Sequence, residues 1–186
     1  MPTFDIANRL ADKWQERVTC SPKIIDTDHA YIHEGIAYDA WFNGSISSTY
    51  HLQFSTPSTL YVHLRPTAIG ISGGSATFRV FQAGTGTATP VSGGSTFTPV
   101  NKKYTSTSAS EVTFNTGINT SSTAAYTLKY ESSIFGGSGG GSRIGGTVSN
   151  GLEWILVPDR DYVFMFTPSS EMNIGVNLFW YEEANA

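Results

Sequence analysis

The chain has 186 residues, a formal net charge of −4 at pH 7 and 14% charged residues, against a typical quarter. This length accommodates one domain with a sizeable core, and the 13% aromatic content argues against a disordered chain. Basic residues cluster no further than the pair Lys102 and Lys103, so nucleic acid is a poor partner. The single cysteine, Cys20, cannot form an intrachain disulfide, which suits assembly in a reducing cytoplasm.

The N-terminus carries no apolar block of the length that a signal peptide needs, and no apolar run approaches 18 residues. We therefore expect a protein that is made in the cytoplasm and has no membrane partner.

The first twenty residues predict an amphipathic helix from about 3 to 18. Thr3 suits the N-cap, and Ser21-Pro22 ends the helix because the residue before a proline avoids helical geometry. We expect residues 1–25 to form an arm that packs on its own domain or docks on a neighbouring subunit. Apolar residues recur along it at steps of three and four, and its contacts would come from Phe4, Leu10 and Trp14.

From residue 29 onward the apolar period changes to two, which indicates half-buried antiparallel strands. Turn-forming clusters separate them at the spacing of an all-β sandwich or barrel, and a parallel α/β sheet is excluded because crossover helices are missing. The sequence therefore predicts an all-β domain over 26–186. We expect eight or nine strands, at about 31–42, 50–54, 60–65, 76–82, 111–115, 124–131, 152–157, 162–166 and 173–182.

Two polar stretches interrupt this pattern. Residues 136–146, GGSGGGSRIGG, have no side chain able to fill a core apart from Ile144 and predict a solvated loop rather than a phosphate-binding cradle. Residues 101–110, NKKYTSTSAS, predict an exposed connection between strands.

Potential metal ligands are densest in one short segment near the start of the domain. The spacing of the two histidines differs from the His-x-His pattern of a cupin metal site, to which the segment has little resemblance. We expect a turn and the beginning of a strand here, with no metal and no cofactor. The residues concerned are Asp26, Asp28, His29, His33 and Glu34.

Catalytic patterns have little support in this sequence. A Gly-x-Ser-x-Gly elbow at a strand-to-helix turn is missing, since Gly137-Ser138-Gly139 falls within the glycine-rich loop. Paired carboxylates for glycoside hydrolysis could come from Glu111, Glu131, Glu153 and Asp159, but their spacing selects no pair. We therefore expect no catalytic residues and no enzymatic activity.

The aromatic residues allow two interpretations. They could form a sugar-stacking platform in a lectin-like module, or they could fill the core, which the apolar neighbours of Trp154 and Trp180 favour. The candidates for such a platform are Trp41, Phe42, Trp154, Trp180 and Tyr181.

The order of segments over residues 26–183 resembles that of the jelly-roll head decoration (cement) proteins of tailed bacteriophages. An acidic segment leads into His33-Glu34-Gly35 and a strand, and a second strand follows the Thr56-Pro57 turn. Asn101-Lys102-Lys103 precedes Ser/Thr-rich strands, and the chain closes on Asn177-Leu178-Phe179-Trp180-Tyr181-Glu182-Glu183 after the glycine-rich loop and Arg143.

The resemblance implies a jelly-roll trimer on the outside of an icosahedral head, where it clamps the major capsid protein lattice in the virion. It also implies subunit or capsid contacts by Lys102 and Lys103, although the family more often carries arginine there. The helix at 3–18 is not part of the family's pattern. A virion-surface lectin-like module that binds glycans is the alternative.

Overall fold

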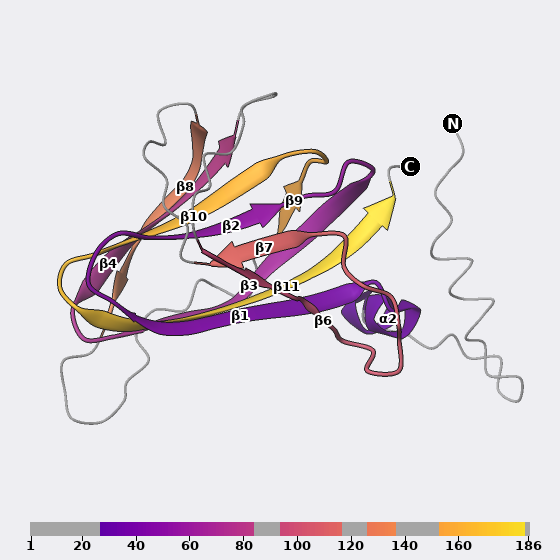
Figure 1. Ribbon diagram of the computed structural model, residues 1–186, viewed down its shortest axis with the longest axis horizontal. Coiled ribbons are helices and arrows are strands. Elements are labelled where there is room, and N and C mark those ends of the chain that lie inside the picture. The colour runs from indigo at the N-terminus through magenta and orange to yellow at the C-terminus, as the bar shows by residue number, and fades with distance from the viewer. Residues whose placement is uncertain (1–26, 84–93, 117–125, 137–152, 185–186) are drawn as a thin grey trace, which may run out of the picture.

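The computed structural model describes residues 27–83, 94–116, 126–136 and 153–184 (Figure 1). The predicted helix at 3–18, the arm 1–25 with Phe4, Leu10 and Trp14, and most of the stretch 136–146 lie outside these described residues. Within them, we find no helix with the length and apolar character needed to cross a membrane.

One helix and eleven strands make up the described part of the chain. The helix is α2 (Thr27–Glu34). The strands are β1 (Ala37–Ile46), β2 (Tyr50–Ser55), β3 (Leu60–Ser72), β4 (Ser75–Ala83), β5 (Ser95–Phe97), β6 (Val100–Asn101), β7 (Thr113–Thr116), β8 (Tyr126–Phe135), β9 (Trp154–Leu156), β10 (Asp161–Pro168) and β11 (Met172–Ala184).

The strands form two antiparallel sheets. Sheet A has the order β6-β1-β11-β3-β9, and sheet B has the order β5-β7-β2-β10-β4-β8. One cluster of buried residues draws side chains from both sheets, so the sheets pack face to face around a shared core. The predicted all-β, antiparallel, sandwich-like architecture is confirmed.

Strand pairing follows a nested order along the chain. β1 pairs with β11, β2 with β10, β3 with β9 and β4 with β8. Further pairing of β11 with β3 and of β10 with β4 joins these pairs into the two sheets. The chain therefore runs out along one half of a long antiparallel ribbon and returns along the other.

The period-two pattern correctly identifies the residues that face the core. In β11 the alternate residues Ile174, Val176, Leu178 and Trp180 are all buried. The Trp180 ring meets the Phe54 ring edge-on at a centroid distance of 5.1 Å, which links the middle of sheet A to sheet B.

A helix occupies the segment where we predicted a turn and a strand beginning near residue 31, and this prediction is wrong. Gly35 ends α2 with φ 78°; its N–H donates to the Ile32 carbonyl (3.1 Å), and the Ile36 N–H donates to the Tyr31 carbonyl (3.2 Å). Apolar contacts of Tyr31 and Ile32 with the outer face of sheet A hold a helix that is too short to show a helical period. Figure 1 shows α2 at one end of the sandwich, beside the start of β1.

The sequence also failed to predict β5 and β6. These strands have three and two residues, too few for an alternating pattern, and they form edges of the two sheets.

We predict that Gly35→Ala destabilises the protein more than Gly73→Ala. Both glycines have similar positive φ values, 78° and 76°, so each alanine costs roughly 1–2 kcal/mol in backbone strain. A Cβ on Gly35 would also lie 2.9 Å from the Ser106 Oγ, whereas one on Gly73 would meet nothing within 4 Å. Urea unfolding should show about 1 kcal/mol or more of additional loss for Gly35→Ala. Equal losses for the two variants would contradict this account of the helix end.

Candidate functional site

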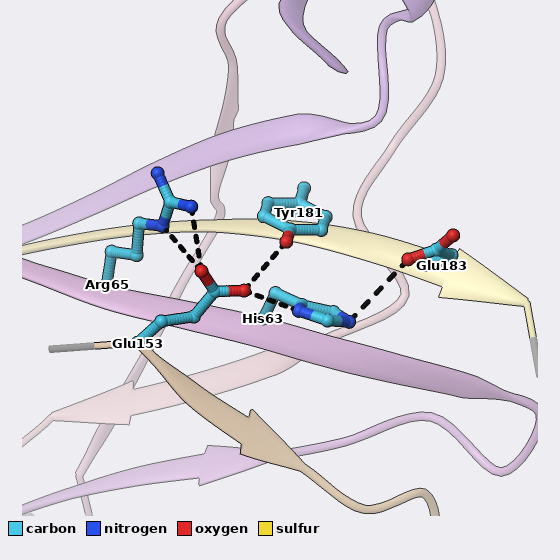
Figure 2. A network of polar contacts seen from close by, with 5 residues as sticks. All are labelled: His63, Arg65, Glu153, Tyr181 and Glu183. Carbon is cyan, nitrogen blue, oxygen red and sulfur yellow. Dashed lines mark hydrogen bonds and ion pairs between the residues drawn. The ribbon is translucent and has the colours of Figure 1, made fainter. Parts of the chain in front are cut away.

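The candidate site is a cluster of aromatic and charged side chains on the outer face of sheet A, next to α2 (Figure 2). Strand β11 passes through its centre, between β1 and β3. We call this cluster the Glu153 network; it consists of His63, Arg65, Glu153, Tyr181 and Glu183.

Three stacked rings form the aromatic part of the site. Tyr181 of β11 stacks on Tyr31 of α2 at a centroid distance of 3.9 Å and on His63 of β3 at 4.4 Å. His63 is the cross-strand partner of Tyr181, and Ala37 of β1 is its partner on the other side. Because alanine is small, it leaves room for the helix to approach the sheet.

Glu153 lies at the centre of the polar contacts, immediately before the short edge strand β9. Its Oε1 accepts a hydrogen bond from the Tyr181 hydroxyl (2.7 Å) and lies 2.6 Å from Nδ1 of His63. Its Oε2 accepts hydrogen bonds from Nε (3.1 Å) and Nη2 (2.7 Å) of Arg65. One carboxylate thus ties β9 to β3 and β11.

His63 faces carboxylates on two sides. In addition to its contact with Glu153, its Nε2 lies 3.6 Å from Oε2 of Glu183. The Arg65 guanidinium lies 6.0 Å from the centre of the Tyr181 ring, close enough for a cation–π contact. The cluster therefore combines one guanidinium and one imidazole with two carboxylates.

The electrostatics fix the charge of Glu153. Partial burial raises the pKa of this carboxyl, but hydrogen bonds from Tyr181, Arg65 and His63, together with the Arg65 charge, outweigh it and hold the pKa at about 2. Burial, followed by the hydrogen bond to Glu153, raises the pKa of Tyr181. At neutral pH the site therefore presents a fixed anion hydrogen-bonded to a neutral phenol.

The other three acids considered for catalysis lie on separate elements. Glu131 is on β8 and pairs with Arg79, on the outward side of sheet B. Asp159 lies in the turn after β9, and Glu111 lies between β6 and β7, where its backbone N–H donates to Glu182. These acids come from different parts of the sandwich, and the Glu153 carboxylate is fully used in ion pairing and hydrogen bonding.

The potential metal ligands Asp28, His29, His33 and Glu34 fall within α2. Asp26 lies outside the described residues. The described part of the chain has no group of three or more His, Cys, Asp or Glu side chains that could hold a metal ion.

Lys102 and Lys103 lie in the connection after β6 and contact this same chain. Nζ of Lys102 lies 2.6 Å from Oδ2 of Asp39, and Nζ of Lys103 donates to the His33 carbonyl (2.7 Å) at the end of α2. Residues 102–110 are exposed or half-buried, as predicted for an exposed connection. A capsid or subunit contact by these lysines stays a prediction.

Asn101 fixes this connection, and our sequence reasoning noted it only as part of the resemblance. Its Nδ2 donates to the carbonyls of Gly35 (2.8 Å) and Ser108 (3.0 Å), and its Oδ1 accepts from the Lys103 N–H (2.9 Å). The turn-forming character of asparagine is the signal that could have identified it.

Glu182 is the second important residue that our sequence reasoning noted only as part of the resemblance. This carboxylate is buried, with 6% exposure, and its Oε1 accepts hydrogen bonds from the Ser110 hydroxyl and from Nε1 of Trp180 (3.1 Å). Its Oε2 accepts from the Glu111 N–H (3.0 Å). The 101–112 connection is thus attached to the end of α2 by Asn101 and to β11 by Glu182.

Four of the five aromatic residues proposed for sugar stacking serve in packing. Trp180 is fully buried, Tyr181 lies within the three-ring stack, Phe42 stacks on Tyr50 at 4.7 Å, and Trp154 packs against the core. Trp41 is 46% exposed and is the one that presents a substantial surface to solvent.

Comparison with known protein families, curated proteins and solved structures finds no match to this chain.

We predict that Glu153→Gln lowers stability in a pH-dependent way. The folded-state pKa of about 2 lies below the ordinary 4.5, so the contribution of Glu153 is complete above pH 4.5 and is lost as the pH falls toward 2. At pH 7 the substitution should cost about 1 kcal/mol, a value reduced for solvent screening at this exposed residue. Urea unfolding from pH 7 to pH 2 should show the difference between the two proteins shrinking below pH 4.5.

Glu131→Gln is the matched control for this measurement. Glu131 lies on edge strand β8 and forms an exposed ion pair with Arg79 of β4. Its substitution should therefore change the free energy of unfolding by less than about 0.5 kcal/mol. A Glu153→Gln variant that matches this control at pH 7 would show that the network contributes nothing to stability.

Proposed function

We propose that this protein is a bacteriophage capsid decoration protein that binds the outer surface of the icosahedral head as a homotrimer and stabilises the lattice of the major capsid protein. It would be made in the host cytoplasm and act on the capsid exterior of the virion. This role requires no catalytic residue and no cofactor, and it involves neither nucleic acid nor membrane.

The observation that carries the proposal is the nested strand pairing. A jelly roll forms when a long antiparallel ribbon wraps into two packed sheets. The four nested pairs, β1 with β11 through β4 with β8, and the orders β1-β11-β3-β9 and β2-β10-β4-β8 fit that arrangement. They support the jelly roll that the resemblance implies, with β5, β6 and β7 as additions at one side.

A clamp on a capsid needs a rigid body more than it needs reactive groups. The Glu153 network fixes edge strand β9, and Asn101 and Glu182 fix the longest described connection. A rigid protein that binds assembled capsid more tightly than loose subunits stabilises the shell by mass action. A trimer makes each contact three times, so a modest single-site affinity becomes high avidity.

The glycan-binding alternative loses most of its predicted platform, because four of the five aromatic residues are packed in the fold. Exposed Trp41 is the observation that keeps the alternative open.

We expect the purified chain to elute with a mass near three times 20.1 kDa in size-exclusion chromatography with light scattering, and to co-elute with undecorated heads of its cognate capsid. The heads should then resist heat or chelator-induced rupture better than undecorated ones. A monomer that does not bind the heads would contradict the proposal.

Deleting residues 1–20 should weaken head binding and leave the melting temperature of the trimer nearly unchanged. This expectation rests on the predicted capsid-contacting role of Phe4, Leu10 and Trp14. Light scattering and calorimetry of the deleted chain test it, with Lys102→Ala/Lys103→Ala as a second variant for the other predicted contact. A deleted chain that falls apart into monomers would instead assign the arm to the trimer interface.

A further inference from the structure

The outer face of sheet A has a second half, away from α2, that differs chemically from the Glu153 network. Alternate residues of β1 and β11 and the end of β3 point outward there, since their neighbours Ile46, Ile71, Ile174 and Val176 face the core. All the outward side chains listed next are exposed and uncharged. We call this surface the amide face; it consists of Trp41, Asn43, Ser45, Ser72, Asn173 and Asn177.

Strand register arranges the amide face in rows across the sheet. Ser45 lies opposite Asn173, which lies opposite Ser72, and Trp41 lies opposite Asn177. Neighbouring strands are about 4.8 Å apart, and successive rows about 7 Å apart. Trp41 therefore has an amide next to it along β1 and another across to β11.

Gly175 of β11 lies between these rows and places no side chain on the amide face. Gly175 is the partner of Asn43, and a Cβ at Gly175 would lie 2.9 Å from Oδ1 of Asn43. The Asn43 amide therefore rests over β11 in a place that a larger residue at 175 would claim. The absence of a side chain at Gly175 therefore determines where the Asn43 amide lies.

Trp41 supplies an exposed aromatic ring at the margin of this face. It is 46% exposed, and the Phe97 ring supports it edge-on at a centroid distance of 5.3 Å. Support from one side holds the indole in place while leaving part of its surface available to a ligand.

We propose that the amide face binds a neutral carbohydrate. Each asparagine amide both donates and accepts hydrogen bonds, as sugar hydroxyl groups do, and the apolar C–H face of a pyranose can lie on an indole ring. Uncharged groups complement a neutral sugar. The charged neighbours of Trp41 on the same face of β1, Asp39 and Lys102, are paired with each other (2.6 Å). Glu171 marks one end of the face, where its Oε1 accepts a hydrogen bond from Ser45 (3.2 Å).

A protein partner fits this face less well. The centre of a protein interface is enriched in large apolar and aromatic residues, and Trp41 is the one such residue among the six. The inference is independent of the capsid proposal, because carbohydrate binding by the amide face does not require the predicted capsid contacts.

The test is binding of the full-length protein to an array of immobilised neutral, sialylated and sulfated oligosaccharides, followed by fluorescence titration with maltohexaose, cellohexaose and chitohexaose. We expect binding within the neutral set. Trp41→Ala should weaken the best binder at least tenfold, and Asn43→Asp should weaken it by a similar factor because it adds charge and removes a donor.

Two further variants show whether a loss of carbohydrate binding is specific to the amide face or follows from removing any exposed aromatic residue. Gly175→Ala displaces the Asn43 amide and should also weaken binding, whereas Tyr104→Ala removes an 86% exposed aromatic elsewhere and should leave binding unchanged. Circular dichroism checks that each variant is folded. The proposal is overturned by an array with no neutral binder, by preference for charged glycans, or by binding that survives Trp41→Ala.

Discussion

The structure depends on the position of the last strand between two earlier ones. β11 has thirteen residues and pairs with β1 along one edge and with β3 along the other, so sheet A cannot form until the end of the chain arrives. One face of β11 places Trp180 in the core, where its ring meets Phe54 of sheet B. The other face places Tyr181 under α2 and beside Glu153. Core, helix and polar network thus share a single strand, and their formation should be cooperative.

The outer face of sheet A divides into two chemical surfaces along that strand. Near α2, Glu153 pairs with Arg65, and His63 lies between the carboxylates of Glu153 and Glu183, in a compact network that holds an edge strand. Toward the start of β11, the outward side chains are neutral amides and hydroxyls, and Trp41 lies beside them. One half of the face thus stabilises the fold, and the other half carries the proposed carbohydrate site.

Periodicity predicted the strands with long alternating patterns, including the inward face of β11, because burial on one side of a sheet imposes a period of two. It could not predict α2, whose eight residues are held by contacts of Tyr31 and Ile32 with a strand about 150 residues away in sequence. The Glu153 network was also beyond the sequence. Glu153 was one of four unselected acids, and strand register alone brings it to Arg65 and Tyr181. Asn101 acts through contacts with backbone groups, and Glu182 through one backbone N–H and the side chains of Ser110 and Trp180, none of which an apolar pattern reveals.

The most direct test of the capsid proposal is a cryo-electron microscopy reconstruction of cognate heads with and without the protein. We predict added density of three sandwiches around local three-fold axes on the outer surface, in contact with adjacent major capsid subunits. Heads whose outer surface is unchanged after saturation with the protein would contradict it.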